Sequence, residues 1–243
     1  MSEFEPVTFE SPVQKQLYKQ VERSGPQALD DLVSAVEVDT DSAEAALGTL
    51  EEKGYVEQSG SEVRLRLDLG EEQRHETRDF TYVVRPARES DFDAVLDVVE
   101  SIADKKTYVI AERLAAELAY DETVLRHNSI QSRVFFIATA DDTVIGWSHL
   151  DLPLTQKLRP TAELTVGVRE SYRGYGIGTE LLERALSWAH DNDYLKVYKN
   201  VARTNMQAVS FLESRGWEQE GIRDDHYRIG HKQVDQIMMA HTF

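Results

Sequence analysis

The sequence predicts an α/β protein in two parts: a large domain on a mixed β-sheet and a small N-terminal domain of helices closed by a hairpin. Three observations predict this. From residue 80 onward, strand-like and helix-like segments alternate. Residues 11–53 carry apolar side chains at helical spacing. Residues 68–79 are charged and have no apolar period, which is typical of a linker.

The N-terminal domain, residues 1–67, is predicted to hold three helices. Apolar residues recur at helical spacing over 13–21, 29–36 and 45–50. Asp41 or Ser42 can cap the third helix, and Gly54 ends it. The stretch YVEQSGSEVRLRL, residues 55–67, has two alternating runs around Ser-Gly-Ser and predicts a hairpin.

The second domain, residues 80–243, is predicted to hold seven strands and several helices. We expect strands at 80–87, 133–140, 143–152, 162–168, 194–201, 217–229 and 233–243. We expect helices at 90–104, within 111–128, at 205–216, and after residue 178, where apolar residues recur up to 189.

Composition narrows the class of protein. The formal net charge is −17, and the basic residues are 18 arginines against 9 lysines, which favours a halophilic cytoplasm over an ordinary acidic enzyme. The absence of cysteine excludes disulfides, thiolate metal sites and cysteine nucleophiles. No apolar stretch approaches the ~18 residues of a membrane span, so we expect a soluble, cytoplasmic protein without membrane partners.

The stretch ESYRGYGIGTELLERALSWA, residues 170–189, places three glycines at alternate positions before an amphipathic run. A P-loop needs a lysine after its last glycine, but Thr179 and Glu180 follow Gly178. A dinucleotide fingerprint fails as well, because its third glycine would fall at Thr179. The remaining interpretation is a strand, a glycine turn and a helix N-terminus whose N–H groups face a pyrophosphate, with Arg173 adding charge.

This stretch resembles the acetyl-CoA motif of the GNAT superfamily, the Gcn5-related N-acetyltransferases. Its pattern, Arg/Gln-x-x-Gly-x-Gly/Ala, is met by Arg173, Gly176 and Gly178. The resemblance covers residues from about 80 to the C-terminus. Further matches lie on both sides of the turn: Val166, Val168, Asn205, Ala208, Gly216 and Trp217.

The resemblance implies the GNAT fold and acetyl-CoA as co-substrate. The strand ending at Val168 would splay from the strand at 194–201, and the pantetheine arm would pair with the backbone of Val166 and Val168. Asn205 would bond the pantetheine or relay solvent. The pyrophosphate would meet Arg173 and the N–H groups of Gly174, Tyr175, Gly176, Ile177, Gly178 and Thr179.

The catalytic residues are less sharply indicated. The amine must lose a proton before it attacks, and we name Glu163 as the base that takes it. Strand parity places the Glu163 side chain on the opposite face from Val166 and Val168. A solvated carboxylate at the end of a strand would explain Glu163 equally well. The family's usual tyrosine acid is replaced by Leu212. Tyr198 or Tyr172 could supply that proton, or water could.

Other polar and aromatic residues have competing explanations. Tyr108 and Glu112 fall where the family's first helices overhang the acceptor, although a helix-linking loop explains them too. We expect His149 to be hydrogen-bonded within a strand rather than to act as a base. The seven histidines show no metal-ligand spacing, so no metal is predicted.

The N-terminal domain resembles a winged helix. Through residue 75 it carries 17 acidic and 7 basic residues, so DNA binding is disfavoured and dimerisation or partner docking is favoured. The leading hypothesis is an N-acetyltransferase that moves acetyl from acetyl-CoA to a primary amine in a ternary complex. The alternatives are a winged-helix regulator that senses acyl-CoA and a protein acetyltransferase that docks its target on the winged helix.

Overall fold

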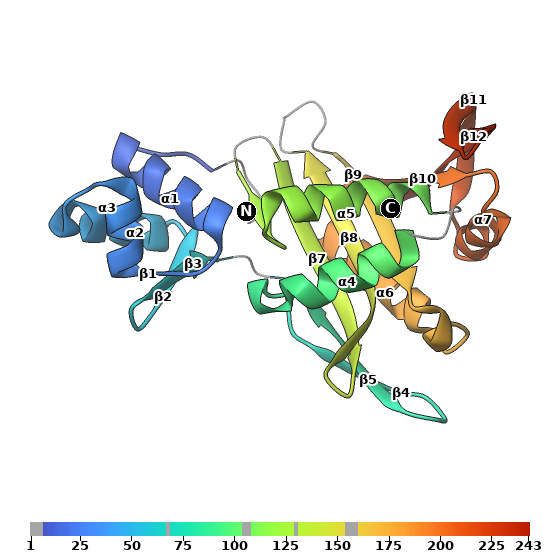
Figure 1. Cartoon of the computed structure of the whole chain (residues 1–243), viewed down its shortest axis with the longest axis horizontal. Coiled ribbons are helices and arrows are strands. Elements are labelled where there is room, and N and C mark those ends of the chain that lie inside the picture. The colour runs from blue at the N-terminus through green and yellow to red at the C-terminus, as the bar shows by residue number, and fades with distance from the viewer. Residues whose placement is uncertain (1–6, 67–68, 104–107, 129–130, 154–159) are drawn as a thin grey trace.

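The computed structural model describes residues 7–66, 69–103, 108–128, 131–153 and 160–243. The chain forms two regions that lie side by side along the long axis of the molecule (Figure 1). The smaller region holds the N-terminal residues, and the larger region holds the main sheet and its helices.

The N-terminal region contains the predicted three helices and hairpin. Its elements are α1 (Pro12–Ser24), β1 (Gln27–Ala28), α2 (Leu29–Val36), α3 (Thr40–Glu52), β2 (Val56–Ser59) and β3 (Glu62–Leu65). The strands form a sheet in the order β1-β3-β2. The cap predicted for α3 is wrong: the helix begins at Thr40, so the carboxylate of Asp39, not Asp41 or Ser42, accepts the N–H of Ser42 at 2.8 Å.

The larger region is built on one mixed sheet. In the described residues its strands are β4 (Gln73–Glu76), β5 (Thr81–Pro86), β6 (Arg126–His127), β7 (Gln131–Ala140), β8 (Thr143–Pro153), β9 (Thr161–Val168), β10 (Lys196–Ala202), β11 (Glu218–Ile229) and β12 (Lys232–Thr242). Their order is β11-β12-β10-β9-β8-β7-β5-β4, and β6 pairs with β7. Neighbouring strands are antiparallel except β9 and β10, which are parallel.

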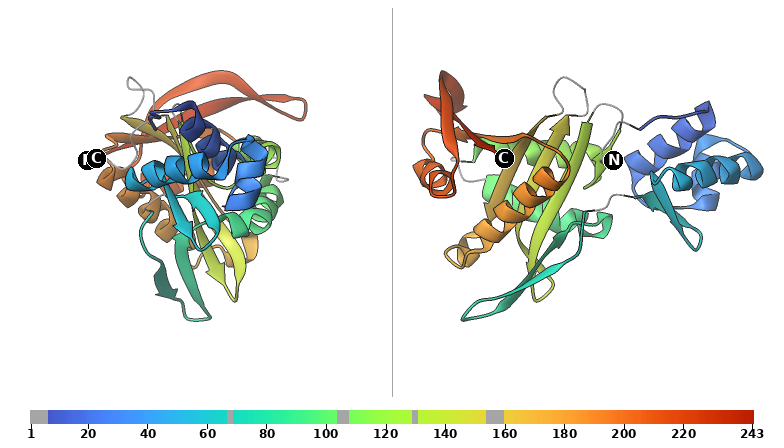
Figure 2. Two further views of the ribbon diagram at one scale, coloured as in Figure 1. Left: turned by 90° about the vertical axis from the view of Figure 1, so that its left-hand side faces the viewer. Right: turned by 180° about the vertical axis from the view of Figure 1, so that it is seen from behind.

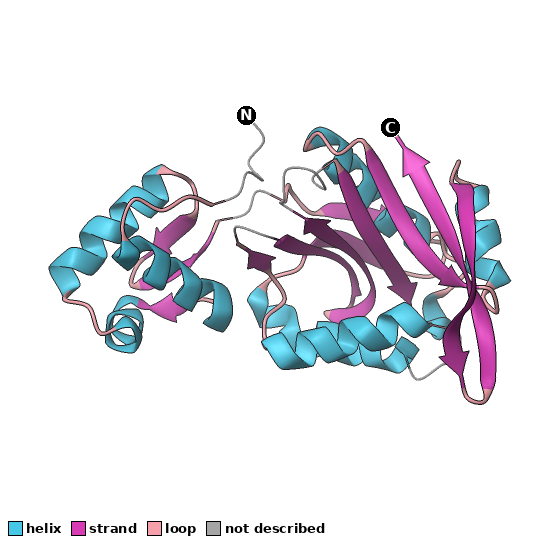
Figure 3. Ribbon diagram, turned by 90° about the horizontal axis from the view of Figure 1, so that it is seen from above, coloured by secondary structure: helices cyan, strands magenta, loops and turns pink. Residues whose placement is uncertain are grey.

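Helices cover both faces of this sheet. Helices α4 (Phe92–Ala103) and α5 (Val109–Asp121) lie on one face, and α6 (Ile177–Asp191) lies on the other (Figures 1 and 2). Seen from above, the strands run between these two layers (Figure 3). Phe135 and Trp147 belong to the core under α4 and α5, whereas Leu181 belongs to the core under α6. Helix α7 (Met206–Glu213) packs its Leu212 into this second core.

The segment expected as a linker is partly sheet. Within 68–79, β4 pairs with β5 through contacts such as His75 with Tyr82, whose rings stack 5.0 Å apart. The sequence QRHE shows no apolar alternation because β4 is an exposed edge strand with no face in the core.

The two regions are joined by a buried hydrogen bond. The hydroxyl of Tyr18 on α1 donates to the carbonyl of His127 on β6 at 2.6 Å. Asn128, the next residue, donates to the carboxylate of Glu22 at 3.1 Å. The N-terminal region is therefore anchored to a strand of the main sheet.

Candidate active site

The parallel strands β9 and β10 pair over only a short length. Their register runs from Thr161 opposite Lys196 to Glu163 opposite Tyr198 and ends there. Beyond this point β9 continues to Val168 along β8, and β10 continues along β12. The two strands therefore diverge into a notch whose apex lies at Glu163 and Tyr198.

One edge of the notch is formed by main chain of β9 that, among the described residues, pairs with no strand on its β10 side. The N–H of Arg169 donates to Ile145 on the β8 side at 2.9 Å, and backbone groups alternate in direction along a strand. Leu164, Val166 and Val168 therefore turn their N–H and C=O groups toward β10. Two hydrogen bonds from side chains agree with this direction of the backbone groups. Lys199 Nζ donates to the carbonyl of Leu164 at 3.3 Å, and Arg173 Nε donates to the carbonyl of Val168 at 2.9 Å.

The notch opens into a cavity of ≈ 480 Å³. Its walls come from β9, the glycine turn, the start of α6, β10, α7 and the segment that begins at Tyr108. Tyr175 lies outside the lining, and its ring packs 5.1 Å from Phe80. The other residues predicted to hold the co-substrate line the cavity: Val166, Val168, Arg173, Gly174, Gly176, Ile177, Gly178, Thr179 and Asn205.

The glycine turn owes its composition to backbone conformation. Gly174 and Gly176 have φ of 84° and 87°, in the left-handed region where other residues are strained. A Cβ at either position would meet no atom within 4 Å, so the space before the turn is open. Gly176 is the N-cap of α6, and the first N–H groups of a helix have no partner within it. The turn therefore presents donors to an open space.

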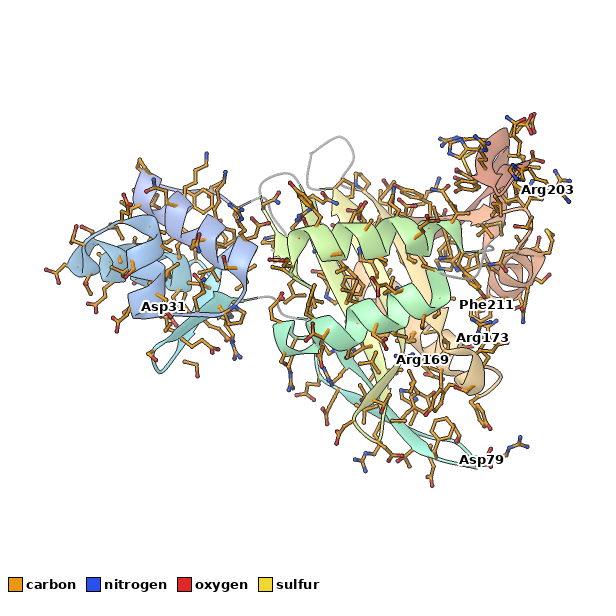
Figure 4. All side chains as sticks on the ribbon, in the orientation of Figure 1. Asp31, Asp79, Arg169, Arg173, Arg203 and Phe211 are labelled. Atoms are coloured by element: carbon orange, nitrogen blue, oxygen red, sulfur yellow. The ribbon has the colours of Figure 1, made fainter. Side chains whose placement is uncertain are left out.

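Two guanidinium groups stand at this turn. Arg173 lies 5.5 Å over the ring of Tyr108, and Arg215 donates to the hydroxyl of Thr179. Arg215 also lies 3.9 Å over the ring of Phe211, and Figure 4 shows Phe211 and Arg173 at the same end of the sheet. The sequence analysis did not single out Arg215, although it directly precedes Gly216 and Trp217, which match the family pattern.

Glu163 sits in a buried hydrogen-bonded cluster beneath α5. It is 8% exposed, which rules out the interpretation as a solvated carboxylate. Asn200 donates to one of its oxygens at 2.9 Å, and Arg113 donates to the other at 3.3 Å. Gln236 donates to the Asn200 carbonyl at 2.6 Å and so fixes the orientation of that amide. The sequence did not single out Arg113, Asn200 or Gln236.

Other titratable groups lie near this carboxylate. Asp151 is its neighbour across β8 and β9, and burial raises the pKa of Asp151. Burial, together with the negative charge of Glu163, raises the pKa of Tyr198. Burial likewise raises the pKa of Tyr227, on β11, to about 12.

The remaining predicted site residues are divided between the cavity and its surroundings. Tyr108 lines the cavity, whereas Glu112 is exposed on α5 and lies outside the lining. Glu163 and Tyr198 also lie outside the lining, behind Asn200 and its neighbours. Asn205 lines the cavity and caps α7, since its Oδ1 accepts the N–H of Ala208 at 3.2 Å. Its amide NH₂ is left to donate to a ligand.

His149 departs from expectation. It is buried on β8 with its ring 4.6 Å from Phe135, and among the described residues neither ring nitrogen has a hydrogen-bond partner. Its neighbours across the strands are Phe135 on β7 and Thr165 on β9. Burial, with help from nearby cations, holds the pKa of His149 well below its usual range, so the ring is neutral.

The described residues hold neither a bilayer-spanning helix nor a group of metal ligands. None of its helices combines the length and apolarity that crossing a bilayer requires. Within the same residues, no three His, Asp or Glu side chains are grouped as metal ligands would be.

Comparisons with known proteins identify the larger region. The Acetyltransferase (GNAT) family model matches residues 97–217. The N-alpha-acetyltransferase RimI of Mycobacterium tuberculosis is 35% identical over 65 residues, which cover 27% of this chain and 39% of that protein. The chain thus matches well under half the length of this curated relative.

Solved structures share the fold at low identity. A GNAT-family acetyltransferase from Streptococcus pneumoniae superposes with a TM-score of 0.56 at 17% identity, covering 67% of this chain and 99% of that one. The ribosomal-protein-alanine N-acetyltransferase from Brucella melitensis gives 0.52 at 18% identity, covering 66% and 99%. The putative acetyltransferase yncA from Salmonella typhimurium, solved with acetyl-CoA, gives 0.53 at 15% identity, covering 66% and 93%. Residues 97–217 therefore form an acetyltransferase domain of the GNAT family.

Proposed function

We propose that the protein transfers the acetyl group of acetyl-CoA to a primary amine by direct attack in a ternary complex. The single observation that carries this proposal is the cavity, which joins the glycine turn, the edge of β9 that faces β10, and the first residues of β10 beyond the apex, Lys199 and Asn200, in one space. Such a space accommodates a diphosphate at one end and a reacting thioester at the other.

The co-substrate occupies the notch as an added strand would. Its pantetheine amides pair with the backbone of Val166 and Val168, and the NH₂ of Asn205 donates to the same arm. Its pyrophosphate accepts hydrogen bonds from the N–H groups of the turn at residues 174–179, where the positive end of the α6 dipole also favours anions. Arg173 and Arg215 add charge on either side.

The acceptor enters from the α5 face, where Glu163 lies. An amine arrives protonated at neutral pH, so it must lose a proton before it attacks. Glu163 takes this proton through one water beside Thr165 and Asn200, which line the cavity in front of it. A backbone N–H at Val166 or Val168 polarises the thioester carbonyl. Tyr108 closes the cavity over the acceptor, and Glu112, outside the lining, attracts amines at the entrance.

Release of free thiol from acetyl-CoA, measured against a panel of amines at low and molar salt, tests this function. The panel contains amino acids, polyamines, aminoglycosides and peptides with free N-termini or lysines. We expect thiol release with at least one of these acceptors, together with acetylated product by mass spectrometry. Tight binding of CoA without turnover of any amine would instead favour an acyl-CoA sensor.

A second candidate function rests on the N-terminal region. Its element order α1-β1-α2-α3-β2-β3 and its small sheet support the winged-helix resemblance proposed from the sequence. A fused regulator would use α3 to read DNA, but Glu44, Glu51 and Glu52 give that helix the wrong charge. We therefore propose that this region docks a protein partner. Salt-sensitive binding to duplex DNA in a mobility-shift assay would reverse this ranking.

A further inference from the structure

Lys199 is a buried cation at the apex of the notch. It is 9% exposed and lines the cavity. Its Nζ donates to the carbonyl of Leu164 at 3.3 Å, and the described residues provide no other hydrogen bond or ion pair for it. A buried ammonium without a paired carboxylate is destabilising, so its position calls for a functional explanation.

The side chain of Lys199 lies on the opposite face of the sheet from the acceptor cluster. Along β10, Val197 and Val201 belong to the core under α6 and α7, and Lys199 shares their parity. Asn200, with the other parity, bonds Glu163 beneath α5. Lys199 therefore faces the α7 side, where Leu212 also lines the cavity.

The position of Lys199 places its ammonium group near the expected position of the leaving group, the thiolate of coenzyme A. A co-substrate that runs from the glycine turn into the notch carries its sulfur toward the apex, because the turn follows the open end of β9. At that apex Leu212 can neither donate a proton nor stabilise charge. Of the side chains that line the cavity at this depth on the α7 side, Lys199 is a cation with N–H groups to spare.

We propose that Lys199 is the acid that protonates the sulfur of coenzyme A as it leaves. The proposal rests on the acetyl transfer proposed above and adds a residue to it. The acceptor and the acid then approach the thioester from opposite faces of the sheet, so neither obstructs the other.

The step balances as follows. The neutral amine attacks the carbonyl carbon, a C–N bond forms, and the C–S bond breaks with its electron pair on sulfur. The Lys199 ammonium gives that thiolate one proton and becomes a neutral amine. The acceptor nitrogen loses two protons in all, one before attack and one as the C–S bond breaks. Glu163 takes each in turn and passes it through water to solvent, and Lys199 regains one proton from solvent. Each turnover releases one proton net.

The acidity of Lys199 suits this role. Burial lowers the pKa of Lys199 to about 8, although the negative charge of Glu163 opposes the shift. A free thiol has a pKa of about 8.5, so the two groups exchange a proton with little energetic penalty. Tyr198, one of the two tyrosines that the sequence offers as the acid, has a raised pKa and lies outside the cavity lining on the α5 side. The other, Tyr172, lines the cavity next to the glycine turn, with its ring 5.5 Å from that of Phe80.

Two measurements on the full chain test the proposal, with K199M and K199R as variants. K196M is the matched control, because Lys196 lies on the same strand but pairs with Glu220 outside the cavity. Y198F tests the rival acid. The first measurement is ultraviolet titration of the thiolate in bound coenzyme A, which requires no turnover. The second is the pH profile of kcat with an acceptor amine.

In the titration, we expect the thiol pKa of bound coenzyme A to be lower in wild type and K199R than in K199M by about one to three pH units. In turnover, we expect kcat of both Lys199 variants to be about 10²- to 10⁴-fold lower than that of wild type. The kcat of wild type should decline above about pH 8, whereas the kcat of the variants should show no such decline. K196M and Y198F should behave as wild type. K199R loses activity despite its charge, because a guanidinium does not release its proton.

Three results would overturn the proposal. One is an unchanged thiol pKa in K199M that still binds coenzyme A, and another is full kcat in K199R, which would reduce Lys199 to a fixed charge. The third is loss of the high-pH decline in Y198F. If wild type binds coenzyme A but acetylates no amine, the proposed function fails while the titration still decides whether Lys199 stabilises a thiolate. If wild type does not bind coenzyme A, both proposals fail.

Discussion

Replacing Gly176 with valine separates the conformational role of the glycine turn from its proposed role in binding anions. Gly176 has φ of 87°, and a non-glycine residue in this region is strained by about 1–2 kcal/mol. For a protein of this size, that penalty lowers Tm by roughly 2–8 °C. Gly230, in the β11–β12 turn, has φ of 62° and the same open surroundings, so G230V carries the same strain at a distance from the cavity.

The two variants should differ in binding. A valine at 176 places methyl groups in the open space before the turn and shifts the first N–H groups of α6. Loss of two hydrogen bonds to a charged group, each contributing about 1.5–3 kcal/mol, weakens binding of coenzyme A by at least about 100-fold. G230V should bind coenzyme A like wild type.

Calorimetry with coenzyme A and thermal unfolding of both variants check this pair of expectations. If G176V lost the same few degrees in Tm as G230V yet bound coenzyme A with wild-type affinity, the turn would not be the diphosphate site. Equal loss of affinity in both variants would show that general strain, not the cavity, governs binding.

Three further predictions concern single side chains. R215M should weaken coenzyme A binding by about 10- to 100-fold in calorimetry, because Arg215 lines the cavity. R223M, on the exposed face of β11, should not change the affinity. Equal affinities of the two variants would show that Arg215 does not bind coenzyme A. E163Q should lower kcat by about 10²- to 10³-fold, and a wild-type kcat in E163Q would exclude Glu163 as the base. Burial lowers the pKa of His127 to about 4 in the folded protein. As pH falls, His127 therefore takes up a proton in the unfolded chain before it does so in the folded one, and the free energy of unfolding should fall between about pH 6.5 and 4. H127Q should flatten that slope in denaturant titrations, and a slope equal to that of wild type would place the titrating group elsewhere.

The sequence was sufficient for features that depend on neighbouring residues. The strand before Arg173, the positive-φ glycines and the amphipathic start of α6 lie within twenty residues, so their periodicity predicts the turn correctly. The edge strand β4 escaped notice because it has no buried face and therefore no apolar pattern.

The cluster around the apex could not be predicted in this way. Asn200, Gln236 and Arg113 come from three distant elements. Asn200 and Arg113 reach Glu163, and Gln236 reaches Asn200, only after β12 pairs with β10 and α5 packs against β10. Lys199 is similar: a lysine in an alternating strand is usually solvated, and its burial follows from the divergence of β9 and β10. Such partnerships depend on contacts between residues far apart in the chain.

The unpaired edge of β9 has a consequence for how such proteins diverge. The groups that Leu164, Val166 and Val168 turn toward β10 belong to the peptide backbone, which every residue except proline carries in full. Substitution at these positions changes what packs above and below the sheet while leaving the row of donors and acceptors in place. In the binding mode proposed above, side chains along this part of β9 can therefore change while the backbone groups that pair with coenzyme A stay the same.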